Sequence, residues 1–198
     1  MSTVIFKEFN APEIDRREIL RYMGCKESST EIDSLIDRSL ALCKNKLSYK
    51  VCFSEFNISL VGEICDLGFA KTESHDLAKC LAGCKKVIVF GATVGLQLDR
   101  LILRYGKIEP SVSVCLQAIG AERIEALCDA FCTEMGERYA IEGRGLRPRF
   151  SAGYGDLSIE FQREIFSVLG FDKHIGLTLN DSFIMSPSKS VTAIIGIY

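Results

Sequence analysis

The sequence predicts an α+β domain in which a mixed, mostly antiparallel twisted sheet is flanked by helices. The predicted helices cluster in the first quarter and the middle of the chain, with strands between and after them, rather than alternating as βαβ units. Residues 191–198 are nearly all apolar, which is typical of a strand inside a sheet. Residues 177–185 and 190–198 flank a turn-forming quartet at 186–189, so the tail is expected to form a hairpin.

The first part of the chain is expected to contain two helices before a pair of strands. Residues 28–31 have the pattern of a capping box, and an apolar stripe from Ile32 to Cys43 predicts the helix that follows. Residues 66–74 are expected to form a loop. The other expected elements are a strand at 3–6, a charged helix at 14–22, strands at 49–53 and 56–61, and one or two helical turns at 76–81.

The second part begins with a buried strand at 86–90, which leads through a glycine turn into a helix at 94–105. A turn of this kind is one signal of a nucleotide-binding site, because helix amides face an anion there. Neither glycine-rich fingerprint of such sites is present, so the favoured interpretation is tight packing of the helix on the strand. Residues 111–139 form one long helix or two, interrupted near Gly120. Asp156 and Ser158 are both candidate caps for a helix at 159–169.

Composition excludes several functional classes. Of 198 residues, 47% are hydrophobic and 25% charged, and the net charge is −2, with no basic face that would indicate nucleic-acid binding. The start does not resemble a signal peptide and no apolar run is long enough for a membrane span, so we expect a cytoplasmic protein. The nine cysteines lack a Cys-x-x-Cys pair, which favours reduced apolar fillers over a metal or iron–sulfur site.

The stretch 147–156 concentrates the groups that could hold a small ligand. It contains two arginines, two aromatic residues, two glycines, a proline and a carboxylate, without helix or strand periodicity. Pro148 and the glycines favour an irregular but ordered loop. The alternative is a surface turn with two solvated arginines. On periodicity alone, Asp129 lies with Glu122 and Glu125 on the face of its helix opposite the core and is a solvated carboxylate.

Two motifs carry a resemblance to a known family. Arg149-x-x-x-Gly153-Tyr154 is followed by Ser182-Phe183-x-Met185-x-Pro187-x-x-Ser190-Val191. In this order and spacing they resemble the activation domain of cobalamin (vitamin B12)-dependent methionine synthase, and most closely its small stand-alone members. The resemblance is most specific over 145–196. It implies that 85–198 is an activation-domain-like core on which an N-terminal helical and strand region, 1–84, packs as part of one structural unit.

The resemblance implies binding of S-adenosylmethionine. Asp129, Glu142, Arg149, Gly153 and Tyr154 are the implied ligand-binding residues, with Arg149 pairing with the ligand carboxylate and Tyr154 facing the sulfonium. No side chain is assigned a catalytic or metal-binding role. The corrinoid would be held by a partner, a cobalamin-binding methionine synthase or another corrinoid protein, because no Asp-x-His-x-x-Gly motif occurs here. An electron donor such as flavodoxin or ferredoxin is the second implied partner.

The sequence also departs from the family pattern. Gly155-Asp156 replace a segment with proline and cysteine, an acidic ligand contact near the family domain's start has no clear counterpart, and family residues beyond the last strand have no match before Tyr198. Two functions therefore stay open. One is a methyltransferase component that assists reductive remethylation of a partner's corrinoid. The other is a non-catalytic docking module that has lost the methyl donor. A small-molecule sensor at the turn between Gly91 and Gly95 is a weaker third.

Overall fold

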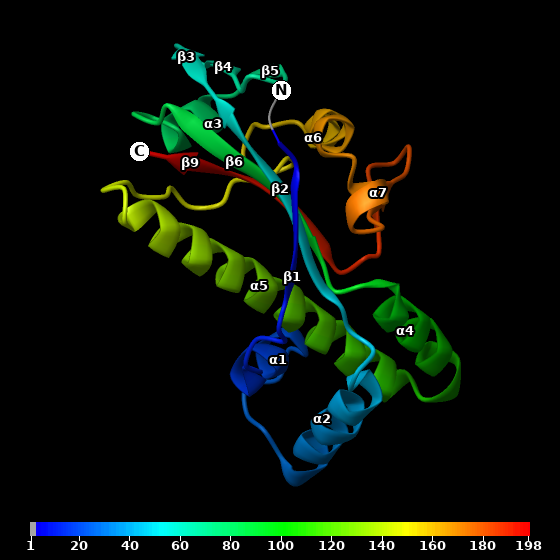
Figure 1. Cartoon of the computed structure of the whole chain (residues 1–198). Coiled ribbons are helices and arrows are strands. Elements are labelled where there is room, and N and C mark those ends of the chain that lie inside the picture. The colour runs from blue at the N-terminus through cyan, green and yellow to red at the C-terminus, as the bar shows by residue number, and fades with distance from the viewer. Residues whose placement is uncertain (1–2) are drawn as a thin grey trace.

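The computed structural model describes residues 3–198, and its centre is a four-stranded antiparallel sheet. The strand order is β1-β2-β6-β9, and the long helix α5 crosses one face of this sheet (Figure 1). Strands from the first 84 residues and from the rest of the chain thus pair within one sheet. The four strands are β1 (Ile5–Phe9), β2 (Tyr49–Asn57), β6 (Lys86–Thr93) and β9 (Ser190–Ile197).

The pleat of β2 directs apolar side chains to both faces of the sheet. Val51 and Phe53 enter one core, whereas Cys52 and Phe56 enter the other, as the period of two along a strand requires. The next strand, β6, is buried on both faces, which explains why its sequence is a continuous apolar run.

One core lies between the sheet and four helices. Ser29 caps α2, since its hydroxyl accepts a hydrogen bond from the Ile32 amide at 3.3 Å, so the cap lies one residue after Ser28, the hydroxyl that begins the expected capping box. The helix α5 continues through Gly120 without interruption, which answers the question of one helix or two. The helices of this face are α1 (Arg16–Tyr22), α2 (Thr30–Cys43), α4 (Leu96–Ile108) and α5 (Pro110–Ala140).

The other core is closed by short elements and two small sheets. The expected loop at 66–74 instead contains a strand of a three-stranded sheet, whose short strands carry little apolar signal. These elements are β3 (Ser59–Val61), β4 (Ile64–Asp66), β5 (Lys71–Glu73), α3 (His75–Cys80), η1 (Ile159–Phe161), α6 (Gln162–Leu169), α7 (Phe171–His174), β7 (Thr178–Leu179) and β8 (Met185–Ser186).

Three further expectations for the strands were wrong. The expected strands at 49–53 and 56–61 are one strand, β2, that ends at Asn57 and is followed by β3. The tail hairpin does not form, because β9 pairs with β6, while β7 and β8 pair only with each other. Finally, β9 is an edge strand of the main sheet and not an interior one. Its apolar side chains are nevertheless buried, because they enter the cores on both faces of the sheet, and a segment of irregular backbone pairs with its outer edge.

The glycine turn after the predicted strand at 86–90 is also different. Gly91 lies inside β6, and a Cβ there would be 2.5 Å from the ring of Phe171. The residue permits close packing, but between the sheet and α7 and not with the helix that follows the strand, and its place inside a strand does not suit a phosphate cradle. The α+β class with a mostly antiparallel sheet and flanking helices is confirmed.

Candidate functional site

The stretch 147–156 lies along the free edge of β9. The Arg147 amide donates to the Gly196 carbonyl at 2.8 Å, and Phe150 and Ile194 exchange two backbone hydrogen bonds at 2.9 and 2.8 Å. These bonds satisfy edge groups that would otherwise face water or another chain. The loop is therefore ordered although its sequence has no strand periodicity.

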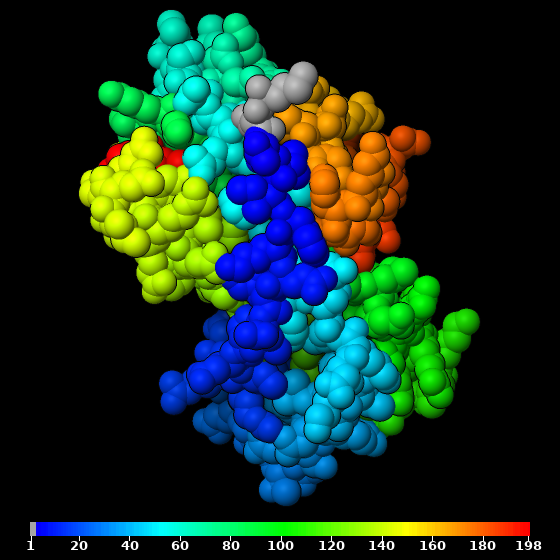
Figure 2. Space-filling model, in the orientation of Figure 1, coloured from blue at the N-terminus to red at the C-terminus, as the bar shows by residue number. Residues whose placement is uncertain are grey.

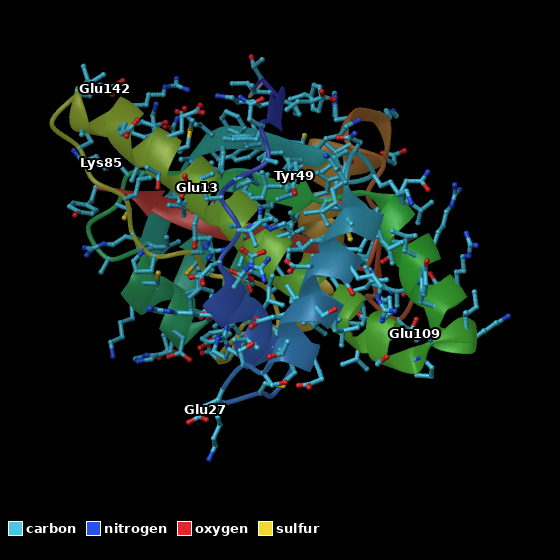
Figure 3. All side chains as sticks on the ribbon, turned by 90° about the horizontal axis from the view of Figure 1, so that it is seen from below. Glu13, Glu27, Tyr49, Lys85, Glu109 and Glu142 are labelled. Atoms are coloured by element: carbon cyan, nitrogen blue, oxygen red, sulfur yellow. The ribbon has the colours of Figure 1, made fainter. Side chains whose placement is uncertain are left out.

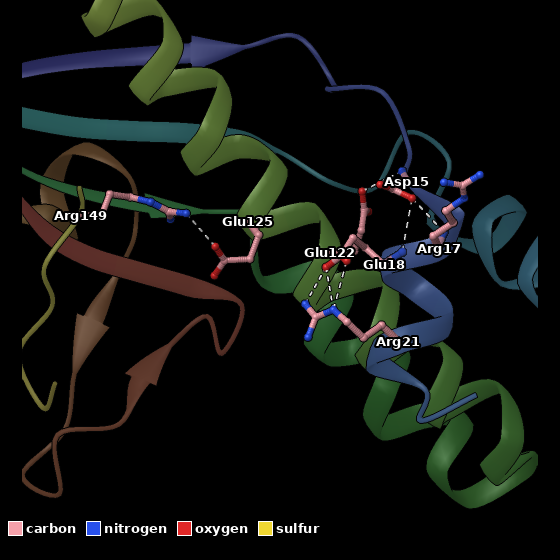
Figure 4. Close-up of polar contacts among 7 residues, drawn as sticks. All are labelled: Asp15, Arg17, Glu18, Arg21, Glu122, Glu125 and Arg149. Carbon is pink, nitrogen blue, oxygen red and sulfur yellow. Dashed lines mark hydrogen bonds and ion pairs between the residues drawn. The ribbon is translucent and has the colours of Figure 1, made fainter. Parts of the chain in front are cut away.

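Arg149 leaves this edge toward α5 and meets two carboxylates. Its Nη2 lies 3.0 Å from Glu125 Oε2 and 2.9 Å from Asp129 Oδ1, and Figure 4 shows the Glu125 contact. These acidic residues are four positions apart, so they share one face of the helix. The Arg149 side chain is 25% exposed and that of Asp129 is 71% exposed. Burial alone would lower the pKa of Arg149, but its neighbours, Glu125 among them, raise it above the usual value.

Arg147 has a different role from Arg149. Its Nη2 donates to the Ala82 carbonyl at 2.9 Å, and the guanidinium lies 4.6 Å from the centre of the Tyr198 ring. These contacts fix the start of the loop against the turn after α3 and the end of β9. Both arginines of the loop therefore have protein partners. The alternative of a surface turn with two solvated arginines is wrong.

The end of the loop is anchored by Asp156. Its carboxylate accepts a hydrogen bond from the Ser74 hydroxyl and bonds from the amides of His75 at 2.7 Å and Asp76 at 3.3 Å. Ser74 is the N-cap residue of α3, with its hydroxyl 3.0 Å from the Leu77 amide, and Asp156 adds bonds to this helix start and not to the helical segment that follows it. Ser158 caps that segment, with its hydroxyl 3.2 Å from the Glu160 amide.

Gly153 and Tyr154 occupy the tight turn between these anchors. Gly153 has a φ of +87°, a conformation that favours glycine, and a Cβ there would lie 2.9 Å from Ile159 Cδ1. Tyr154 is 72% exposed and its ring packs edge-on against Phe150, with ring centres 6.0 Å apart. An exposed aromatic ring is thus presented beside a glycine whose missing side chain makes room for Ile159.

Glu142 is separate from this cluster. It is exposed just beyond the end of α5 and pairs with Arg144 at 3.2 Å. Figure 3 labels Glu142 at one end of α5 and Glu109 at the other. Among the interactions of residues 3–198, no hydrogen bond or ion pair joins Glu142 or Tyr154 to Arg149. The structure therefore brings Arg149 and Asp129 into contact but not the other two side chains.

Sequence reasoning missed Glu125 and misplaced Glu122. Glu125 contacts Arg149, although it was grouped with solvated residues. Its spacing of four from Asp129 was the available signal. Glu122 is 3% exposed and pairs with the equally buried Arg123, whereas periodicity placed it on a solvated face. The error arises because the N-terminal segment covers this part of α5, as the hydrogen bond from the Asp15 amide to Glu122 shows (Figure 4).

Within residues 3–198, no group of three or more His, Cys, Asp or Glu side chains is placed to hold a metal ion. None of the helices in the same range combines the length and the apolar character needed to cross a bilayer. All nine cysteines are free thiols.

Comparison with known proteins gives one informative result. No protein-family model matches the chain, and no curated protein matches it. Among solved structures, the chain is similar to one named "Crystal Structure of the MetH Reactivation Domain bound to AdoHcy", with a TM-score of 0.75 and 14% sequence identity. The match covers 98% of this chain and 78% of that one. The chain therefore has the fold of a MetH reactivation domain, as its two motifs led us to expect.

Proposed function

We propose that this protein binds S-adenosylmethionine at the Arg149 loop and assists reductive remethylation of a corrinoid held by a separate protein. The observation that carries the proposal is the shared fold over 98% of the chain with a domain whose structure is named as bound to AdoHcy, the demethylated form of that methyl donor. The partner would be a B12-dependent methionine synthase or another corrinoid methyltransferase, and the site of action the cytoplasm.

The chemistry of the loop suits a ligand with both an ammonium and a carboxylate. Arg149 offers the fixed donors of a guanidinium to a carboxylate, while Asp129 and Glu125 offer acceptors to an ammonium a few ångströms away. The exposed ring of Tyr154 suits a sulfonium or an adenine face. Gly153, with its positive φ and its close contact to Ile159, sets the turn that presents Tyr154. A zwitterionic amino-acid group would replace the existing ion pairs between Arg149 and the two carboxylates with pairs to its own carboxylate and ammonium.

The reaction asks little of the side chains beyond placement. A one-electron donor such as flavodoxin or ferredoxin would reduce the partner's cob(II)alamin, and the methyl group would pass from sulfonium to cobalt, leaving S-adenosylhomocysteine. No proton moves in this transfer, so no general acid or base is needed. Holding the sulfonium over the metal is worth several kcal/mol where the geometry is maintained.

Calorimetry with S-adenosylmethionine tests the proposal. The wild-type protein should bind the ligand, and Arg149→Ala should weaken binding about tenfold or more because a charge-assisted hydrogen bond is lost. Arg144→Ala is the matched control, since this arginine pairs with Glu142 in the same segment, away from Asp129. Absence of heat with the wild-type protein at millimolar ligand would contradict methyl-donor binding.

A second function is a docking module that recognises a corrinoid protein without the methyl donor. The observation that favours it is that Arg149 is already neutralised by two carboxylates. Co-purification with a partner carrying the corrinoid absorption spectrum, undiminished by Arg149→Ala or Tyr154→Phe, would support this function. Loss of the partner in either variant would favour the first.

A further inference from the structure

A cavity lies at the opposite edge of the main sheet from the Arg149 loop. Its volume is about 720 Å³, and it is bounded by the chain after β1, the end of α2, the start of β2 and the middle of α5. In Figure 2, green atoms of α5 are visible in the gap between the blue N-terminal segment and cyan α2. Ligand sites for small molecules have volumes of roughly 300–1,000 Å³. Its apolar walls include Phe9, Ile14, Leu40, Leu47 and Ile119.

The cavity also has a buried polar group, Arg123, whose side chain is 2% exposed. Its guanidinium donates to the Pro12 carbonyl at 2.6 Å, to the Glu13 carbonyl, and through Nε and Nη2 to Glu122. Four of its five N–H groups are thereby used, and the guanidinium also hydrogen-bonds to the side chain of Tyr49. The same bonds fix the segment after β1 as one wall of the cavity.

Tyr49, at the start of β2, brings a second donor to this point. It lines the cavity and lies against the Arg123 guanidinium (the residue is labelled in Figure 3). Burial raises the pKa of Tyr49, so its hydroxyl keeps its proton at neutral pH. The Tyr49 hydroxyl accepts from Arg123, so its own O–H is the donor left for a ligand in a space that is otherwise mostly apolar.

Two of the charged residues that line the cavity already have partners of opposite charge. Arg123 is paired with Glu122, and Glu8 lies 3.4 Å from Lys50. Lys44 is exposed at the rim, where water screens its charge. An anionic ligand would bring an unpaired charge against an apolar wall, which is costly, whereas a neutral acceptor would not.

We propose that this cavity binds a neutral, largely apolar small molecule that presents one carbonyl or hydroxyl oxygen to the Tyr49 hydroxyl, which Arg123 holds in place. Such a ligand places its apolar body against the walls and accepts the Tyr49 hydrogen bond at its polar end. The site does not depend on S-adenosylmethionine binding, because Arg149, Gly153 and Tyr154 do not line it.

Octanamide and octanoate are suitable probes, because they share a chain and differ in charge. In ¹H–¹⁵N spectra of the full chain, octanamide should shift the amides of Ala41 and Tyr49 in a saturable way. Octanoate should bind about tenfold more weakly. Tyr49→Phe should weaken octanamide binding about fivefold, which corresponds to one neutral hydrogen bond.

A blocking variant and its control make the test decisive. Ala41 is exposed on α2 and lines the cavity, so Ala41→Phe should abolish octanamide binding without changing the core. Ala140→Phe places the same ring on an exposed alanine at the end of α5 and should leave binding unchanged. The proposal is overturned if octanamide causes no saturable shift, if Ala41→Phe binds normally, or if octanoate binds as tightly. Calorimetry with S-adenosylmethionine on Ala41→Phe separates this outcome from failure at the Arg149 loop.

Discussion

Asp156 is the residue that most directly connects the candidate site to the rest of the molecule. It bonds to the hydroxyl of Ser74, which lies 82 positions earlier in the chain, and to two amides of the first turn of α3. A carboxylate at a helix N-terminus is favoured by both these hydrogen bonds and the helix dipole. The residue therefore has a structural role within a motif whose neighbours we assign to ligand binding.

The state of this carboxylate makes stability depend on pH. The Ser74 hydroxyl and, after it, the backbone amides lower the pKa of Asp156 below its usual value. A depressed pKa in the folded state contributes stability above the unfolded pKa, near 4, and that contribution is lost as the pH falls through the folded pKa. Asp156→Asn should thus be less stable than wild type at pH 7, with a difference that shrinks below pH 4.

Urea unfolding of both proteins at pH 7 and pH 3 measures this difference. Titration of the other carboxylates affects both proteins alike and cancels in the comparison. Asp181→Asn, at an exposed position in the tail, should show no such pH-dependent difference. If Asp156→Asn matched the wild type at pH 7, the anchoring role of Asp156 would be wrong.

Residues whose contacts are local in sequence were the most predictable. Ser158 acts as a cap, as its position before an apolar run indicated, and the cap of α2, Ser29, is one residue from the start of the expected capping box. The pairing of Arg149 with Glu125 joins residues 24 positions apart, and helix periodicity alone could show only that Glu125 and Asp129 share a face. What covers that face is decided by the return path of the chain, which leaves no local mark.

At the scale of elements, α5 contains two glycines with opposite surroundings. Gly120 packs at a close approach, since a Cβ there would lie 2.6 Å from Leu98 Cδ2 and 2.8 Å from Lys189 Cγ. Gly136 has no atom within 4 Å of the corresponding position. The first glycine is needed for packing of α4 and the tail on α5, whereas the second only weakens the helix.

Alanine substitutions should separate the two cases. Gly136→Ala should raise the free energy of unfolding by about 0.5–1 kcal/mol through helix propensity. Gly120→Ala gains the same propensity, but overpacking against the fully buried Leu98 costs about 1–3 kcal/mol, so the protein should be less stable than wild type. Urea unfolding measures both, and a stabilised Gly120→Ala would show that α4 is not closely packed there.

Strand partners were harder to predict than the strands themselves. The apolar stretches of β6 and β9 were both identified from the sequence, but the hairpin expectation rested on the turn at 186–189. In the structure, β9 pairs with β6 from Lys86↔Ile197 to Thr93↔Ser190, about 100 positions apart in sequence. Burial on both faces favours that pairing, and it cannot be read from a local turn signal.

At the scale of the whole molecule, one sheet separates two hydrophobic cores. Free cysteines lie in both of them: Cys43 and Cys128 on the side of α5, and Cys52 and Cys65 on the side of α6. Burial raises the pKa of Cys43 and of Cys52 to about 11, so these thiols react slowly with alkylating agents in the folded protein. Their reactivity therefore reports how each core opens.

We expect the two cores to unfold together. The strands β2 and β6 contribute side chains to both faces, so neither core can lose its packing while the other keeps the sheet intact. Alkylation with iodoacetamide at pH 8 across a urea series, read by mass spectrometry of peptides, should give the same urea midpoint for Cys43 and Cys52. Cys25, which is partly exposed, should react without urea and serves as the control. An earlier midpoint for Cys52 and Cys65 would mean that the α6 side opens on its own, and that the Arg149 loop can move without global unfolding.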